Sequence, residues 1–155
     1  MIVPLVDRLE RRAVGVGIEP CDRDDALRWF AARFEEAGVV DSADAAFAAL
    51  VEREEIASTV LVEGVAVPHA RVPGARRLAF GVMRVARPIA FGRGAADTVE
   101  LLFAVIGPPE ETAGHVALLA GIARLLDSAR RRSRLLAAET SEALVETLGE
   151  TGAQS

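Results

Sequence analysis

Two stretches of this sequence are apolar on both of their alternating faces, and they restrict the possible folds more than any other feature. Residues 78–86 read LAFGVMRVA, and residues 98–107 read TVELLFAVIG. A strand with one face in water alternates apolar and polar residues, whereas a strand that is apolar on both faces needs cover on both sides. A third, shorter apolar run occupies residues 65–67. The sequence therefore predicts a sheet with a covering layer on each face.

Helical periodicity before and after these runs provides the two covering layers. The first expected helix starts after Asp22 and ends at Gly38, and the second runs from Asp41 or Ser42 to Arg53-Glu54. A third starts at residues 110–112 and has an apolar stripe of Val116, Leu119, Ile122, Ala123 and Leu126. Two further helices are expected at residues 129–138 and 141–148. Ser141 is expected to cap the last helix and Gly149 to end it. Residues 13–18 fit a short edge strand. Because helices both precede and follow the strands in the sequence, we predict an α/β sandwich rather than a helical bundle.

Length and charge exclude several classes of protein. A chain of 155 residues is expected to form one domain, followed here by a flexible tail at residues 151–155. The net charge of -5 argues against a nucleic-acid partner, because affinity for a phosphate backbone comes mainly from Lys and Arg. The densest basic run, at residues 130–134, is expected to be a solvated helix face.

The single cysteine, Cys21, excludes an internal disulfide and is typical of a reducing compartment. No histidine or second cysteine is close to it in the sequence, so an inert thiol is expected. The first fifteen residues are too charged for a signal peptide, and no apolar stretch reaches membrane-spanning length. We therefore expect a cytoplasmic protein without direct membrane insertion.

The chain has two histidines, and both occupy positions where functional groups are common. His69 follows Pro68 at the end of the 65–67 run, and loops at strand ends carry many functional groups of α/β folds. His115 lies in the first turn of the helix opened by GPPEETAGH. Unpaired backbone N–H groups and a positive helix dipole at that position suit an anion.

The chemistry of the residues leaves four interpretations of His69 open. A zinc site needs three or four ligands, which two histidines and one remote cysteine do not supply, so no metal is expected. A serine or cysteine nucleophile with a histidine base lacks an elbow motif. His69 as nucleophile is the third, because a neutral imidazole with a pKa near ~6.5 offers a ring nitrogen to a phosphoryl group. In the fourth, His69 is a half-buried residue at a strand end and Arg53 is a surface charge.

Phosphoryl transfer would require cationic and hydrogen-bonding groups around His69. Its loose transition state is stabilised mostly by position and charge. The candidates for this support are Arg53, Thr59, Arg71 and His115.

The order of these pieces resembles the enzyme IIA domains of the fructose/mannitol type from the bacterial phosphotransferase system. The motifs that carry the resemblance are Arg53-Glu54, Ser58-Thr59, Gly64-Val65-Ala66-Val67-Pro68-His69, ARPIAFG at residues 86–92 and VELLFAVIGPPEETAGH at residues 99–115. The resemblance extends over residues 5–150. It implies an α/β fold of one domain, with a small mixed β-sheet sandwiched between helices.

The resemblance also implies roles for three residues and for partner proteins. It makes His69 the phosphorylated residue, His115 a second active-site histidine and Arg53 the arginine that supports the phosphate. Such domains accept a phosphoryl group from the carrier protein HPr and pass it to an enzyme IIB domain in sugar uptake. Stand-alone members of the nitrogen-related branch instead control partner proteins according to their phosphorylation. No cofactor is implied.

Two departures from the family pattern concern the loops. Residues 60–62 are Val-Leu-Val where the family commonly has glycines, which can shape a loop that approaches the phosphate. Residues 92–97 look shortened or divergent. A degenerate binding module that has lost transfer is therefore a third alternative for the function. For partner docking the sequence offers Ile56, Val65 and Val72, each of which fits the core equally well.

Overall fold

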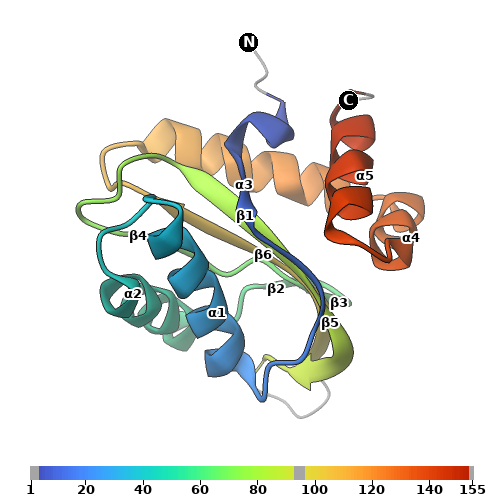
Figure 1. The fold of residues 1–155 in the computed structure, drawn as a ribbon, viewed down its shortest axis with the longest axis horizontal. Coiled ribbons are helices and arrows are strands. Elements are labelled where there is room, and N and C mark those ends of the chain that lie inside the picture. Colours follow the sequence, from blue (N-terminus) through green and yellow to red (C-terminus); the bar gives the residue numbers. More distant parts are fainter. Residues whose placement is uncertain (1–3, 93–96, 154–155) are drawn as a thin grey trace.

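A mixed sheet forms the centre of the computed structural model, which describes residues 4–92 and 97–153 (Figure 1). The strands are β1 (Leu9–Ile18), β2 (Val60–Val62), β3 (Gly64–Ala66), β4 (His69–Arg71), β5 (Ala79–Ala90) and β6 (Thr98–Gly107). The helices are the short 3-10 helix η1 (Leu5–Arg8), α1 (Arg23–Glu36), α2 (Ala43–Ile56), α3 (Thr112–Leu126), α4 (Ala129–Ala137) and α5 (Ser141–Ala153). Helices α1 and α2 cover one face of the sheet, and α3, α4 and α5 cover the other.

The strand order is β1-β5-β6-β3-β2, and β4 also pairs with β6. Strands β5 and β6 are antiparallel at the centre, whereas β3 and β4 are both parallel to β6 and β1 is parallel to β5. The two runs that are apolar on both faces are therefore the central strands of the sheet. The expected edge strand at 13–18 is confirmed as β1, which starts four residues earlier and includes the charged residues 10–12.

Side chains of the central strands divide between two hydrophobic clusters, one under each helical layer. Phe80 and Phe103 stack with their ring centroids 6.2 Å apart, and they pack against α3, α4 and α5. Met83 and Ile106 point to the opposite face and pack against α1 and α2. Each strand thus buries both faces, and the expected α/β fold with a mixed sheet between helices is confirmed.

The N-terminal boundaries of α1 and α2 follow from local capping. The Asp22 carboxylate accepts from the Asp25 N–H at 2.8 Å, and the Ser42 hydroxyl accepts from the Ala45 N–H at 3.1 Å. Each side chain satisfies an N–H group that the helix itself leaves unpaired. Gly38, with φ of 75°, follows the end of α1 in the left-handed conformation typical of a helix C-terminus.

The predicted apolar stripe of α3 is confirmed at Ile122 and Leu126, which are buried, and is wrong at Val116. Val116 is 56% exposed, whereas His115 and Leu118 are buried. Successive helical residues are turned by about 100° from each other, so Val116 points away from the sheet when His115 faces it. The buried face of α3 therefore begins with a polar histidine, which an apolar stripe alone does not include.

The last helix differs from prediction at both ends. Its first turn is capped by Thr140, whose hydroxyl accepts from the Ala143 N–H at 3.1 Å, while the Ser141 hydroxyl donates to the Val14 carbonyl at 3.4 Å. The helix passes through Gly149, the expected end, and continues to Ala153, so the expected tail overlaps the helix. Gly149 does not adopt the positive φ that ends a helix at glycine. No helix within the described residues has the length and apolar character needed to cross a membrane.

Candidate functional site

His69 is the first residue of β4, where parallel pairing sets it opposite Val105 of β6. Its Nδ1 lies 2.8 Å from the carbonyl oxygen of Val67. A carbonyl only accepts hydrogen bonds, so Nδ1 carries the ring proton and donates it. The other nitrogen, Nε2, then keeps its lone pair. This local contact defines Nε2 as the ring nitrogen that is available to react.

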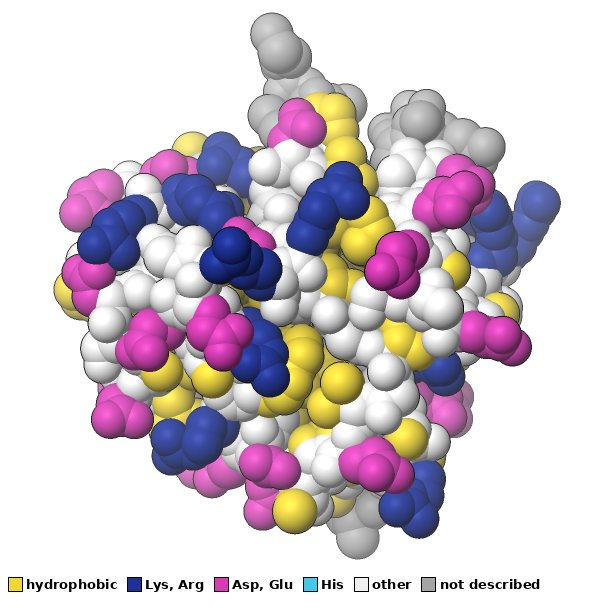
Figure 2. Space-filling model, in the orientation of Figure 1, with side chains coloured by type: hydrophobic (Ala, Val, Ile, Leu, Met, Phe, Trp, Pro, Cys, Tyr) yellow, Lys and Arg dark blue, Asp and Glu magenta, His cyan; other side chains and the backbone are white. Residues whose placement is uncertain are grey.

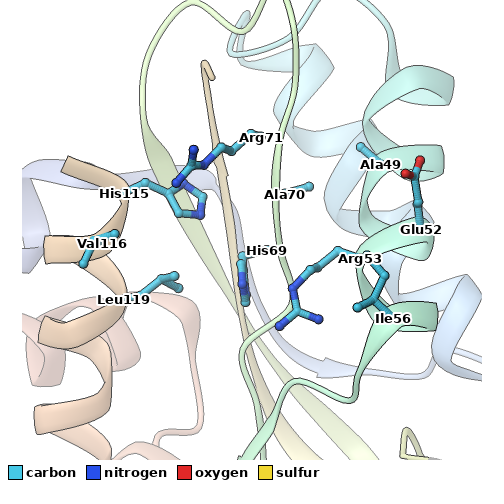
Figure 3. Close-up of a pocket in the computed structure, with 10 residues that line it drawn as sticks. All are labelled: Ala49, Glu52, Arg53, Ile56, His69, Ala70, Arg71, His115, Val116 and Leu119. Carbon is cyan, nitrogen blue, oxygen red and sulfur yellow. The ribbon is translucent and has the colours of Figure 1, made fainter. Parts of the chain in front are cut away.

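His69 lines a cavity of about 390 Å³ between α2, β4 and α3 (Figure 3). The residues around it are Ala49, Glu52, Arg53, Ile56, His69, Ala70, Arg71, His115, Val116 and Leu119. Four of the five residues selected from the sequence, Arg53, His69, Arg71 and His115, therefore meet at one cavity although up to 62 positions separate them in the chain.

His115 faces His69 across the cavity from α3, with the two ring centroids 5.7 Å apart (Figure 3). Only 3% of His115 is exposed, and its Nδ1 is buried without a hydrogen-bond partner among the described residues. Burial, followed by the proximity of His69 and Arg71, lowers the pKa of His115 to about 4. The ring is therefore neutral at pH 7. With its proton on Nε2, it buries only a lone pair and offers an N–H to the cavity.

The backbone at His115 does not contribute the free N–H group that the sequence suggested. Its amide donates to the Glu111 carbonyl at 3.0 Å, as in the helix interior. What α3 contributes to the cavity at this position is the imidazole ring.

Two arginines approach His69 from different elements (Figure 3). Arg53, in the last turn of α2, donates from Nη1 to the Ala57 carbonyl at 2.8 Å. Arg71, two residues after His69 on β4, donates from Nη1 to the Thr112 hydroxyl at 3.3 Å. Both guanidiniums keep further N–H groups that these two bonds do not use. The cavity therefore combines two imidazole rings with two positively charged guanidinium groups.

The pKa of His69 is lowered mainly by burial, and the positive charges of Arg53 and Arg71 lower it further. The hydrogen bond to Val67 and the negative charge of Glu54 act in the opposite direction on the same pKa. The net decrease keeps the His69 ring unprotonated on Nε2 at neutral pH. Such a site suits the binding of an anionic group next to an imidazole nucleophile.

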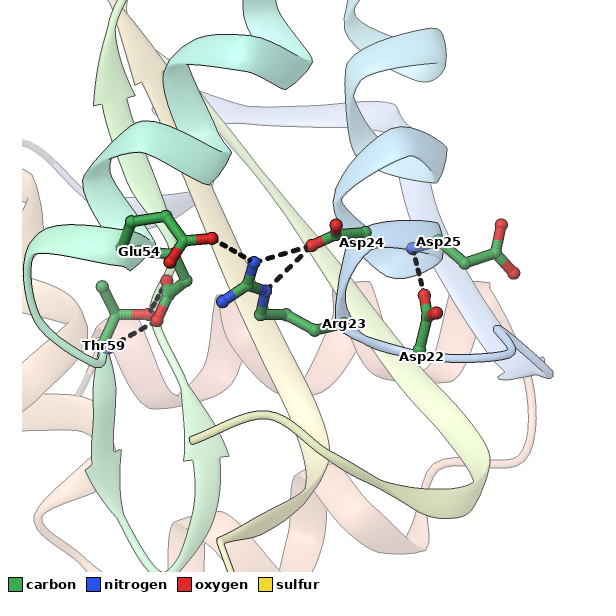
Figure 4. Close-up of polar contacts among 7 residues, drawn as sticks. Asp22, Arg23, Asp24, Asp25, Glu54 and Thr59 are labelled. Atoms are coloured by element: carbon green, nitrogen blue, oxygen red, sulfur yellow. Dashed lines mark hydrogen bonds and ion pairs between the residues drawn. The ribbon is translucent and has the colours of Figure 1, made fainter. Parts of the chain in front are cut away.

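Thr59 is not brought to the cavity. It is 7% exposed, its N–H donates to Glu54 at 2.8 Å and its hydroxyl donates to the same carboxylate at 2.6 Å (Figure 4). Both of its donors are therefore occupied. The sequence suggested no separate role for Glu54, but its position does contain a signal: it lies four residues after Leu50 and eight after Ala46, on the buried face of α2.

Residues 60–62 do not form an open loop. They are strand β2, which pairs antiparallel with β3 through Val60 opposite Ala66 and Val62 opposite Val65. Gly64 adopts a φ of 81° at the start of β3, so the connection keeps one glycine where the backbone requires it. Of residues 92–97, the second divergent stretch, 93–96 lie outside the described residues.

The three residues considered for docking separate into two environments. Ile56 is 71% exposed at the cavity rim, opposite the exposed Val116. Val65 and Val72 are buried and belong to the core, because β3 and the end of β4 lie between the helical layers. An apolar rim on both sides of His69 therefore comes from α2 and α3.

The remaining surface and side-chain clusters show less specialisation. Acidic and basic side chains are interspersed on the face seen in Figure 2. Among residues 4–92 and 97–153, no group of three or more His, Cys, Asp or Glu side chains is arranged to hold a metal ion. Cys21 is exposed.

Fold and site together define an α/β sandwich in which an imidazole at the end of a short parallel strand faces a second imidazole and two arginines. The sequence profile of the family "Phosphoenolpyruvate-dependent sugar phosphotransferase system, EIIA 2" matches residues 9–151. The chain belongs to this family.

Nitrogen regulatory proteins and a sugar-specific component of the phosphotransferase system are both among the relatives that match the chain. A nitrogen regulatory protein of Pseudomonas aeruginosa is 39% identical over 63% of this chain and 64% of its own length. A second, from Bradyrhizobium diazoefficiens, is 30% identical over 94% of this chain and 95% of its own. A fructose-specific EIIA component of Haloferax volcanii is 30% identical over 84% of this chain and 85% of its own.

The fold is also that of a solved relative. The crystal structure of the nitrogen regulatory protein IIA-Ntr from Neisseria meningitidis has a TM-score of 0.84, with 23% identity, over 92% of this chain and 97% of that chain.

Proposed function

We propose that this chain carries a phosphoryl group on Nε2 of His69, accepted from an HPr-type phosphocarrier protein and passed to a second protein. The observation that carries the proposal is the hydrogen bond from Nδ1 to the Val67 carbonyl, which leaves Nε2 as the nucleophilic nitrogen. Membership of the EIIA family supports the same chemistry. We propose that this transfer takes place in the cytoplasm, a reducing compartment of the kind that the single cysteine favours.

The transfer step needs no cofactor or metal ion. The lone pair of His69 Nε2 attacks phosphorus, a new P–N bond forms, and the P–N bond to the donor imidazole breaks with its electron pair returning to the donor nitrogen. The Nδ1 proton stays on His69, where the Val67 carbonyl stabilises the positive charge that the ring acquires. Passing the group on reverses these steps with a different acceptor.

The groups around His69 match the charge that arrives. A phosphoryl group brings about -1.5 to -2 charges. Arg53 and Arg71 supply positive charge from two directions, and the neutral His115 ring supplies an N–H. Thr59 acts indirectly in this proposal, because its donors are bound to Glu54. The apolar rim of Ile56 and Val116 forms the contact surface for the donor and the acceptor.

The names of the relatives suggest two kinds of protein that could receive the phosphoryl group from His69. Relatives named nitrogen regulatory protein favour a target whose activity depends on the phosphorylation of His69. A relative named as a fructose-specific EIIA component favours an enzyme IIB domain in sugar uptake. Offering the phosphorylated protein to a purified fructose-type IIB domain separates the two. Rapid transfer of the label supports the sugar carrier, and loss of label only by slow hydrolysis supports the regulator.

The central proposal is tested by incubation with labelled phosphoenolpyruvate, enzyme I and HPr. We expect a phosphate that is labile in acid and stable in base, and its complete loss in His69→Ala. His115→Ala is expected to accept phosphate but to pass it on poorly, because the acceptor site stays and one charge-stabilising donor is removed. Labelling that persists in His69→Ala overturns the assignment.

A further inference from the structure

Glu54, in the last turn of α2, is a buried carboxylate that does not line the cavity. Only 4% of the residue is exposed, and both carboxylate oxygens accept hydrogen bonds from Thr59. Within the described residues no arginine forms an ion pair with it. Burial of a charged group is costly unless hydrogen bonds compensate it, and in this structure Thr59 supplies both of those bonds.

The hydrogen bonds continue from Thr59 to the reactive ring. The Thr59 carbonyl accepts from the Val67 N–H at 2.9 Å, and the Val67 carbonyl accepts from His69 Nδ1 at 2.8 Å. A continuous path therefore joins the end of α2 to the imidazole through Thr59 and the backbone of Val67. Charge-assisted bonds at its start are shorter and stronger than neutral ones, which makes that end rigid.

Helix geometry gives the adjacent residues Arg53 and Glu54 different directions. Consecutive positions are turned by about 100°, so Arg53 reaches the cavity while Glu54 reaches Thr59 behind it. The same helical turn thus sets the position of a cation in the cavity and of the segment behind His69.

We propose that Glu54 is a positioning residue for His69, which holds Thr59 and through it the Val67 carbonyl that selects the Nδ1–H form of the ring. Without that carbonyl, a histidine side chain favours the form with the proton on Nε2, which blocks the nucleophile. Only the expected effect on the rate of phosphoryl transfer rests on the proposed function. The tautomer itself is a property of the unphosphorylated protein.

Glu54→Met removes both acceptors and keeps a side chain of similar length. We expect the Nε2–H form of His69 to become the major one, and labelling by phosphorylated HPr to slow by roughly fivefold or more, in proportion to the lost competent population. Glu54→Gln is the conservative rescue. Its carbonyl accepts the Thr59 N–H and its NH₂ donates to the Thr59 hydroxyl, so the tautomer and rate stay near those of the wild type.

Glu55→Met is the matched control, because it removes the next carboxylate of the same helix. That carboxylate is 65% exposed and bonds to Arg23 at 3.1 Å, on the surface. We expect the wild-type tautomer and labelling rate in this variant.

The measurement is ¹⁵N NMR of the imidazole nitrogens in unphosphorylated protein near neutral pH, with circular dichroism to verify folding. An unchanged Nδ1–H form in folded Glu54→Met overturns the proposal, even if labelling slows. If Glu54→Met does not fold, Thr59→Val decides, since it removes one of the two bonds: a partial shift to Nε2–H supports the path and no shift contradicts it. Failure of wild-type labelling would instead refute the proposed function and leave the tautomer result standing.

Discussion

The pKa of His115 allows a quantitative test of the site. Burial beside a second imidazole and an arginine lowers this pKa from 6.5 to about 4 in the folded protein. Above pH 6.5 the ring is neutral in both the folded and the unfolded chain, so it adds no pH dependence. Between 6.5 and 4 the unfolded chain binds a proton that the folded protein does not, and stability falls as the pH decreases. Below 4 both states are protonated and the loss is complete.

The size of this effect follows from the shift. At about 1.36 kcal/mol per pKa unit, the full decrease corresponds to roughly 3 kcal/mol, of which about 2 kcal/mol is lost between about pH 7 and about pH 5. The buried Nδ1 explains why protonation is so unfavourable: the imidazolium would place an N–H where no acceptor is present among the described residues.

Urea unfolding of the wild type and His115→Gln at the two pH values isolates this contribution. Carboxylates titrate in both proteins, so their effect cancels in the comparison. We expect the wild type to lose about 2 kcal/mol more than the variant on acidification. NMR titration of the His115 ring in the folded protein checks the pKa directly. An equal pH dependence in both proteins, or a ring that titrates near its ordinary value, would refute the description of His115 as a neutral donor.

Three further predictions concern the fold and the docking rim. Gly81→Ala is expected to lower the free energy of unfolding by about 2 kcal/mol, because a Cβ would lie 2.4 Å from the Ala13 carbonyl oxygen; wild-type stability in urea would show that β1 and β5 are less close. Ser42→Ala should cost about 1 kcal/mol in the same assay, since the cap of α2 is lost, and a change below a few tenths would contradict that role. Ile56→Ser should change stability by less than about 0.5 kcal/mol but slow labelling by phosphorylated HPr, and an unchanged rate would exclude Ile56 from the docking rim.

Much of the fold follows from patterns within short segments. Two strands apolar on both faces require helices on each side, and the segments around them contain helices with visible caps at Asp22 and Ser42. These signals involve residues a few positions apart, so a single sequence contains them in full. The same is true of His69, whose bond to Val67 spans two residues.

Other features depend on contacts between distant segments. The buried face of α3 begins at His115, so the apolar stripe read from the sequence wrongly included Val116 and left out the histidine. Val65 and Val72 lie in the core and Ile56 lies outside it, although all three are similar side chains near the same motif. Burial of this kind is decided by the pairing of β3 and β4 with β6, some 35 residues further along the chain.

The candidate site shows the same division. The residue types that can support a phosphoryl group are visible in the sequence, since each of the two histidines lies at the start of a strand or in the first turn of a helix. The packing of α2 against the sheet decides which of them meet at one cavity. It also decides that Thr59 binds Glu54 and does not line the cavity. The chemistry of each side chain can be read directly from the sequence. The distances between side chains of different segments, and their burial, are set only when segments far apart in the chain pack together and exclude water.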